Sequence, residues 1–270
     1  MRRHRRQRSR LGRVAVFALL FVMITVTVQK FDVWQGFNVR SDLDSGYIST
    51  EASAKISEVA EKHDLQEKDW PKELISLLGK NPDAEEFVLN YPIKKDSDFV
   101  IDLSEYENCD TVPLFFQWDE RWGYSQYGDE LMGLSGCGPT CLSMVCVYLL
   151  QDTSYHPRCI ADFSEENGYY VSGSGSAWTL ISEGGKELGL NVSEVSLDED
   201  VIIQSLEAGN PIICIMGPGD FTTSGHFIVM TDYIDGQIKV NDPNSKIRSE
   251  KLWYFEDIKS QIRNLWVCSR

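Results

Sequence analysis

The chain reads SGCGPTCLSMV over residues 135–145, where a glycine-rich turn leads into an apolar stretch. Apolar residues then recur at spacings of three and four, which predicts an amphipathic helix that begins close to Cys137. Pro139 suits the first helical turn, where its missing N–H costs nothing, and Gly136 and Gly138 allow backbone and substrate to approach closely. A helix N-terminus stabilises a thiolate through its free N–H groups and partial positive charge. Cys137 is therefore a candidate nucleophile.

A histidine that could serve as the matching base occurs 89 residues later, at His226. It begins a β-branched and aromatic run that is typical of a buried strand. The turn signal at residues 235–236 (Asp-Gly) predicts a hairpin into a second strand at 237–240. Adjacent antiparallel strands place their far ends side by side, so Asp242 should lie near His226. Asp242 could hold the second ring nitrogen, and Asn241 could do so less strongly.

These residues fit the roles of a cysteine hydrolase, which needs a thiolate, an imidazole, a group that orients the imidazole, and oxyanion donors. Gln117 is the candidate for a side-chain donor that would act beside the N–H of Cys137, although its spacing alone does not establish this. Each residue also has an ordinary interpretation. A lone cysteine at a helix start is most often a small buried hydrophobe, and an aspartate before proline is an ordinary turn residue.

From about residue 110 onward the chain resembles the papain-like cysteine peptidases of family 39. It is most similar to stand-alone, membrane-anchored relatives of the double-glycine leader peptidases, found in Gram-positive bacteria. The resemblance implies an α+β fold with the nucleophile at the N-terminus of a helix that packs on an antiparallel sheet. It also implies Gln117 as oxyanion donor, Cys137 as nucleophile, His226 as base and acid, and Asp242 as orienting residue. The matching stretches are Gln117-Trp118-Asp119, Arg121-Trp122-Gly123, Gly136-Cys137-Gly138-Pro139-Thr140, Gly225-His226-Phe227 and Asn241-Asp242-Pro243.

The chain departs from the transporter-linked members of that group at two positions. Gly136 stands where an acidic residue is usual before the cysteine, and Gln117 lies about twenty residues upstream rather than a few. The resemblance therefore implies the fold and the thiol chemistry, and it leaves double-glycine leader cleavage open.

The cysteines and histidines do not predict a metal site or any other cofactor. No Cys-x-x-Cys pair occurs among the seven cysteines, and histidines outside the N-terminal tail are isolated. Three cysteines lie in apolar runs and are expected in the core: Cys141, Cys146 and Cys214. Three others have polar neighbours and could form one disulfide outside the cell, with no partner favoured: Cys109, Cys159 and Cys268.

The N-terminus predicts a membrane anchor. Residues 1–13 contain seven arginines and no acidic residue, and residues 14–28 are apolar apart from threonine. This pattern favours an uncleaved transmembrane signal anchor at 14–30 over a cleaved signal, with the basic tail in the cytoplasm. The rest of the chain is then extracellular, as a polar linker at 31–109 followed by a papain-like domain at 110–270.

The linker is expected to contain short helices. The patterns predict them at 53–63, at 71–78 with Gly79 as the stop, and at 84–89, before Pro92. This region could pack on the catalytic domain, could cover it as a propeptide does, or could act as a spacer through the cell wall.

Charge limits the classes of partner. Residues 1–30 hold eight basic side chains and no acidic ones, so the remaining residues hold 18 basic against 41 acidic, a net charge of −23. Nucleic acid is excluded, because a phosphate backbone demands a basic surface. We expect a membrane-anchored peptidase acting on a peptide or protein, with cell-wall peptide as one option. The alternatives are a peptidoglycan amide hydrolase and an inactive binding or scaffolding module of the same fold.

Overall fold

The structure is a computed structural model, and it describes residues 50–270. The predicted basic tail at 1–13 and the predicted anchor at 14–30 lie outside the described residues. Within residues 50–270, none of the helices combines the length and the apolar character that a membrane span requires.

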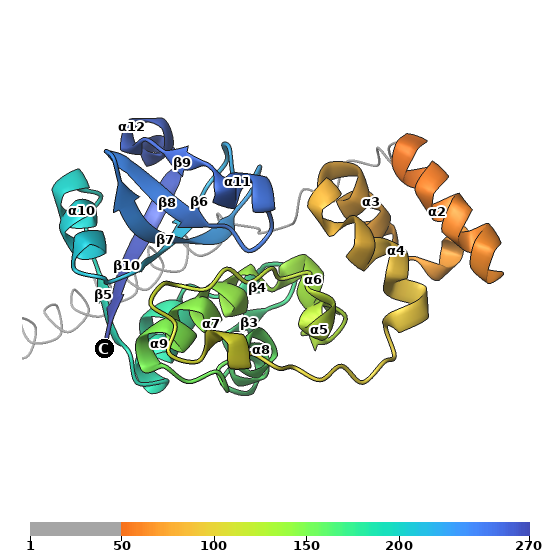
Figure 1. The fold of residues 1–270 in the computed structure, drawn as a ribbon, viewed down its shortest axis with the longest axis horizontal. Coiled ribbons are helices and arrows are strands. Elements are labelled where there is room, and N and C mark those ends of the chain that lie inside the picture. The colour runs from red at the N-terminus through yellow and green to blue at the C-terminus, as the bar shows by residue number, and fades with distance from the viewer. Residues whose placement is uncertain (1–49) are drawn as a thin grey trace, which may run out of the picture. The chain divides into compact units, whose positions relative to one another are not determined.

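The described part is α+β, and its largest sheet has six strands that pair antiparallel throughout (Figure 1). This agrees with the fold class expected from the sequence. In spatial order the strands are β5 (Asn191–Glu194), β10 (Ile262–Ser269), β6 (Ile212–Met216), β7 (His226–Ile234), β8 (Gln237–Asn241) and β9 (Leu252–Trp253). Two-residue strands form two small hairpins: β1 (Gln126–Tyr127) with β2 (Glu130–Leu131), and β3 (Tyr170–Val171) with β4 (Gly175–Ser176).

Both faces of the large sheet are covered. Along β6, Ile213 and Ile215 pack into the core around α7 (Cys137–Leu150), while Ile212 and Cys214 pack into the core around α10 (Glu199–Glu207). Alternation of side chains along a strand explains this division. The remaining helical elements of this part are α5 (Glu120–Gly123), α6 (Met132–Ser135), α8 (Pro157–Glu166), the π-helix Leu180–Gly184, α9 (Gly185–Glu187), α11 (Lys246–Glu250) and α12 (Phe255–Ile258), with short 3-10 turns at Ser104–Tyr106 and Lys259–Gln261.

The helix that carries Cys137 begins where the sequence predicts, but its environment differs. Gly136 is its N-cap residue, and Pro139 lies in its first turn. The predicted amphipathic pattern is wrong, because every residue from Cys137 to Val147 is buried. A helix that is apolar on all sides belongs in a core, and α7 packs between β7 and α8.

The hairpin of β7 and β8 has the predicted turn. Asp235 and Gly236 both have positive φ, at 50° and 82°, as a two-residue turn of this handedness requires. Ile234 pairs with Gln237 next to the turn, and Val229 pairs with Asn241 at the other end. The start of β7 and the residue after β8 therefore lie at the same end of the hairpin, away from the turn, which places His226 near Asp242.

Three helices precede this part of the chain: α2 (Thr50–His63), α3 (Lys72–Lys80) and α4 (Glu85–Lys94). Two 3-10 turns join them, at Glu67–Asp69 and, as η3, at Pro82–Ala84. Their apolar side chains form one core that also includes Tyr124 and Leu131 from the C-terminal part. Of the roles considered for this region, packing on the C-terminal domain is the one that these contacts support.

Two of the predicted helix ends are wrong. α3 continues through Gly79, and α4 continues through Pro92. A proline inside a helix removes the N–H that would bond to the carbonyl four residues earlier, here that of Val88. The indole Nε1–H of Trp70 donates to the Val88 oxygen at 2.8 Å and replaces the missing donor. A tertiary contact thus allows α4 to pass the proline.

We expect Trp70→Phe to destabilise the fold by about 1–3 kcal/mol beyond the loss of packing, because it leaves the buried Val88 carbonyl without a donor. In a Pro92→Ala background the helix itself supplies an N–H to that carbonyl, so the cost of Trp70→Phe should be smaller. Urea unfolding of the four proteins in this cycle measures the difference. An equal cost in both backgrounds would show that the indole hydrogen bond does not support α4.

Candidate active site

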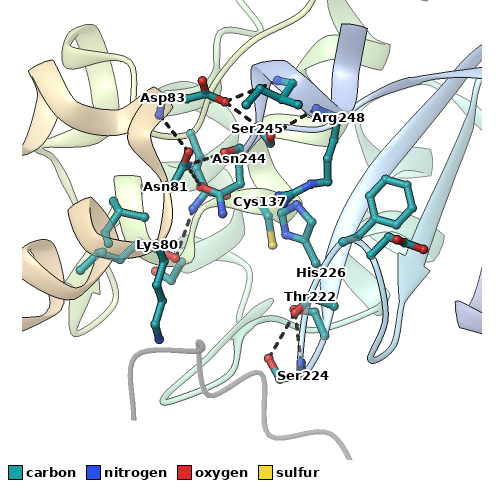
Figure 2. A pocket seen from close by; sticks show the side chains of 18 of the residues that line it. Lys80, Asn81, Asp83, Cys137, Thr222, Ser224, His226, Asn244, Ser245 and Arg248 are labelled. Atoms are coloured by element: carbon teal, nitrogen blue, oxygen red, sulfur yellow. Dashed lines mark hydrogen bonds between the residues drawn. The ribbon is translucent and has the colours of Figure 1, made fainter. Parts of the chain in front are cut away.

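A cleft with a volume of about 490 Å³ opens beside the start of α7 (Figure 2). Cys137, His226 and Gln117 line it, together with the turn after α3 and the loop that leads into β7. Asp242 does not line the cleft and lies fully buried behind His226. The structure therefore brings all four predicted residues into one region.

Cys137 is the first residue of α7, so its N–H has no acceptor within the helix. The residue is 7% exposed. The flanking glycines serve close packing: a Cβ on Gly136 would lie 2.5 Å from the Met132 carbonyl oxygen, and one on Gly138 would lie 2.5 Å from Ser176 Oγ. A larger residue at position 136 would therefore clash with the backbone of α6, and one at position 138 would clash with the β3–β4 hairpin.

His226 is the first residue of β7 and lies with its ring beside the sulfur of Cys137 (Figure 2). Its Nε2 is 2.7 Å from Asp242 Oδ1. This contact leaves Nδ1 as the nitrogen that can exchange a proton with the thiol. Burial alone would lower the pKa of His226, but the Asp242 carboxylate and the Cys137 thiol raise it to about 9.

The carboxylate of Asp242 accepts three hydrogen bonds. Oδ1 accepts from His226 and from the Asn244 N–H at 2.8 Å, and Oδ2 accepts from Arg248 Nε at 2.5 Å. Burial alone would raise the pKa of this carboxyl, but the neighbouring His226 and Arg248 charges hold it below its usual range. Asp242 therefore remains ionised where it contacts the imidazole.

Asn241, the weaker alternative, points elsewhere. Its Nδ2 donates to the carbonyl oxygens of Val112 and Pro113, at 3.1 and 3.0 Å. Successive residues of an extended chain face opposite sides, so only one of the two neighbours can reach the imidazole. Asp242 is that residue.

Gln117 lies in the wall of the cleft with its side-chain amide turned toward α6. Nε2 donates to the carbonyl oxygens of Gly133 at 3.0 Å and Leu134 at 3.2 Å. Its Oε1 is buried without a hydrogen-bond partner among the described residues. The main-chain N–H of Gln117 donates to the Pro243 oxygen at 2.8 Å, which ties this residue to the loop that follows Asp242.

All seven cysteines are free, so the considered disulfide is not formed, and Cys268 is fully buried in the core around α7. Cys141, Cys146 and Cys214 lie in the core as predicted. Within residues 50–270, no group of three or more His, Cys, Asp or Glu side chains could hold a metal ion.

The sequence did not reveal Arg248, although it lies only six residues after Asp242. Neither did it reveal Asn81 and Asp83, which line the cleft from the preceding helical region. Arg248 could have been suspected as a cation six residues after the carboxylate predicted to orient His226. Asn81 and Asp83 carry no local signal that relates them to the loop after Asp242, more than 150 residues further along the chain.

The solved structures that match this chain include two peptidases. The peptidase domain of Streptococcus ComA, a bi-functional ABC transporter involved in a quorum sensing pathway, is 19% identical, with a TM-score of 0.39 over 50% of this chain and 91% of that one. A C39-like peptidase from Bacillus anthracis is 16% identical, with a TM-score of 0.34 over 59% of this chain and 95% of that one. Comparison with curated proteins gives no match.

The family comparison covers the part of the chain that contains the four candidate residues. Residues 109–269 match the Peptidase_C39 like family. This span is more than half of the 270 residues and includes the helix that carries Cys137 and the strand that begins at His226. The chain therefore belongs to the Peptidase_C39 like family.

Proposed function

We propose that this protein is a cysteine peptidase that hydrolyses a peptide or amide bond through an acyl-enzyme on Cys137. One observation carries the proposal. A thiol at a helix start lies beside an imidazole whose other nitrogen is held by a buried, ionised carboxylate, all at the wall of an open cleft. This is the arrangement that a thiol nucleophile and its base require.

In the proposed reaction the Cys137 thiolate attacks the carbonyl carbon of the scissile bond, and the carbonyl oxygen becomes an oxyanion. The His226 imidazolium gives its proton to the leaving nitrogen as the C–N bond breaks, which leaves a thioester on Cys137. Water then attacks the thioester while His226 accepts its proton. The carboxylic product leaves, and the sulfur recovers its starting state.

We propose the Cys137 N–H and the Gln117 side-chain amide as oxyanion donors. The N–H of Cys137 supports this because the helix supplies it no acceptor. For Gln117, one N–H would exchange its present acceptor for the oxyanion. The bond to Leu134, at 3.2 Å, is the longer of the two and is the one we expect to be given up.

The location of the enzyme is also a proposal. The arginine-rich tail and the apolar stretch at 14–28 support a single-pass anchor with the catalytic domain outside the cell. In that location the substrate would be an extracellular peptide or protein, or a peptide of the cell wall. Peptides and wall fragments are therefore the two substrate classes to assay.

Competitive alkylation tests the proposed nucleophile. Cys109 and Cys159 are more exposed than Cys137, so exposure alone predicts that they react first with iodoacetamide. Burial also raises the pKa of both of these thiols. We expect the reverse order at neutral pH, with Cys137 modified about tenfold faster than either of them, because the imidazole beside its sulfur is held by an ionised carboxylate. Cys159 also lies in the first turn of a helix, but the His156 ring next to it accepts the Cys159 N–H as the cap of α8, and no carboxylate of the described residues is bonded to that ring.

Mass spectrometry of peptides from the briefly treated full chain gives the rates. His226→Ala should remove the advantage of Cys137. His63→Ala is the control, because His63 is exposed at the end of α2 and does not line the cleft. Labelling in the order of exposure, or labelling of Cys137 that is unchanged in His226→Ala, would count against a catalytic thiol and favour the binding module.

A further inference from the structure

The loop that carries Asp242 is built as a chain of hydrogen bonds. Asn244 donates its N–H to Asp242 Oδ1. Ser245 caps α11, since its Oγ accepts the N–H of Arg248 at 3.3 Å. The side chain of Arg248 then returns to Asp242 Oδ2. The orientation of the carboxylate that holds His226 thus depends on where the backbone of residues 244–248 lies.

Two side chains from the helical region hold this loop from outside (Figure 2). Asn81 Nδ2 donates to the Asn244 main-chain oxygen at 2.6 Å and to its Oδ1 at 3.1 Å. Asp83 Oδ2 accepts the Lys246 N–H at 2.8 Å and the Ser245 hydroxyl at 3.4 Å. Both lie at the η3 turn between α3 and α4, where Asn81 also caps the turn by accepting the Asp83 N–H.

The same turn forms part of the cleft. Leu77, Lys80 and Pro82 line it together with Asn81 and Asp83, as does the loop that leads into His226. A substrate that reaches the sulfur would therefore lie against the turn. The family match begins at residue 109, so this wall is contributed by a region that the family comparison does not include.

We propose that Asn81 and Asp83 are positioning residues of the active site, and that the helical region Thr50–Lys94 is required for full catalytic activity. Their hydrogen bonds go to residues 244–246 and not to the sulfur or the imidazole. They act by fixing the loop 244–248, which in turn fixes Asp242. This inference rests on the proposed function, because it assigns a role within the same site.

The physical reason is that Asp83 holds the loop at Lys246 and Ser245, where α11 begins. The supports from the C-terminal domain lie earlier in the loop: the Gln117 N–H donates to the Pro243 oxygen, and the Trp118 indole donates to the Asn244 oxygen at 3.3 Å. Without the Asp83 carboxylate, the Lys246 N–H must find another acceptor, and the Ser245 hydroxyl loses an external partner. The start of α11 would then shift, and Arg248 with it. Because a small displacement of a catalytic group is costly, the effect should appear in turnover more than in substrate binding.

Asp83→Ala in the full chain tests the proposal. We expect kcat for peptide hydrolysis to fall about tenfold or more with little change in KM. The NMR titration midpoint of the His226 ring should also move down, because Asp242 no longer holds it in place. Asp83→Asn keeps an acceptor oxygen and should recover most of the loss. Glu85→Ala is the matched control: Glu85 follows the same turn but pairs with Lys55 at 2.8 Å, away from the cleft.

The outcomes separate the two proposals. If Asp83→Ala matches Glu85→Ala in both kcat and His226 titration, the positioning role is wrong, while hydrolysis that requires Cys137 still stands. If the wild type hydrolyses no faster than Cys137→Ala, the proposed function fails, and the titration alone decides the role of Asp83. If Asp83→Ala does not fold, Asn81→Ser replaces it, because serine keeps the cap on η3 but cannot reach Asn244.

Discussion

Cys137→Ala is expected to abolish peptide hydrolysis, with a fall in kcat of about 10⁴-fold or more. The thioester cannot form without the sulfur, and only binding and the oxyanion donors remain to assist direct attack by water. The change removes one small side chain that is largely buried at a helix start, so the fold should persist. The rate should be measured on a peptide library and on purified wall fragments, since both substrate classes are open.

The matched control is Cys141→Ala. Cys141 lies one turn further along α7 and is fully buried, and burial raises the pKa of its thiol well above the usual range. Its loss should lower stability slightly and leave turnover close to the wild-type value. A Cys137→Ala protein that retains wild-type turnover, or a Cys141→Ala protein that folds but loses it, would contradict the assignment of the nucleophile.

The arrangement of Cys137, His226 and Asp242 could be predicted because each depends on local sequence. A proline and two glycines around the cysteine specify a helix start, and a glycine in the turn at 235–236 specifies a tight hairpin. Once the hairpin exists, antiparallel pairing alone brings the two ends together. The sequence already favours Asp242 over Asn241, and the structure adds the geometric reason: the two neighbours face opposite sides, and Asn241 bonds to Val112 and Pro113 instead of the imidazole.

What could not be predicted depends on contacts between distant parts of the chain. Pro92 is a sound local stop signal, but α4 continues through it where Trp70 supplies a donor to the Val88 carbonyl. The contact of Asp83 with Lys246 joins residues 163 positions apart and follows no periodicity. Local rules describe which elements form, whereas the packing of the helical region against the loop after Asp242 is a property of the whole fold.

Asp242→Asn is expected to lower kcat by about 10²-fold or more, because asparagine cannot satisfy the donors that surround the carboxylate. Asp242 presents one oxygen to His226 and another to Arg248. An asparagine must turn its NH₂ group toward one of them. If the NH₂ group faces Arg248, it and the guanidinium are two donors that oppose each other. If the NH₂ group faces His226, it donates to Nε2, so that Nε2 must act as an acceptor and the imidazole must adopt the other tautomer. Asp232→Asn, on the exposed part of the same hairpin, is the matched control.

The same variant has a pH signature with a defined sign. The pKa of His226 is about 9 in the folded chain against an ordinary value of 6.5, so between these values the folded state holds a proton that the unfolded state has lost. The stabilisation from this proton is complete below pH 6.5 and is lost as the pH rises through 9. The pKa of Asp242 is lowered from 3.8, so its contribution is lost only in acid and does not enter this window.

The free energy of unfolding of the wild type should therefore contain a component that falls between pH 6.5 and pH 9. Asp242→Asn removes the charge that raises the pKa of His226, so the dependence should flatten and the ring should titrate at lower pH. Urea unfolding across this range measures the first effect, and NMR of the histidine rings measures the second. Asp232→Asn should reproduce the wild-type slope. If Asp242→Asn also keeps the wild-type slope and midpoint, Asp242 does not set the charge state of His226, and its contact with the ring serves structure alone.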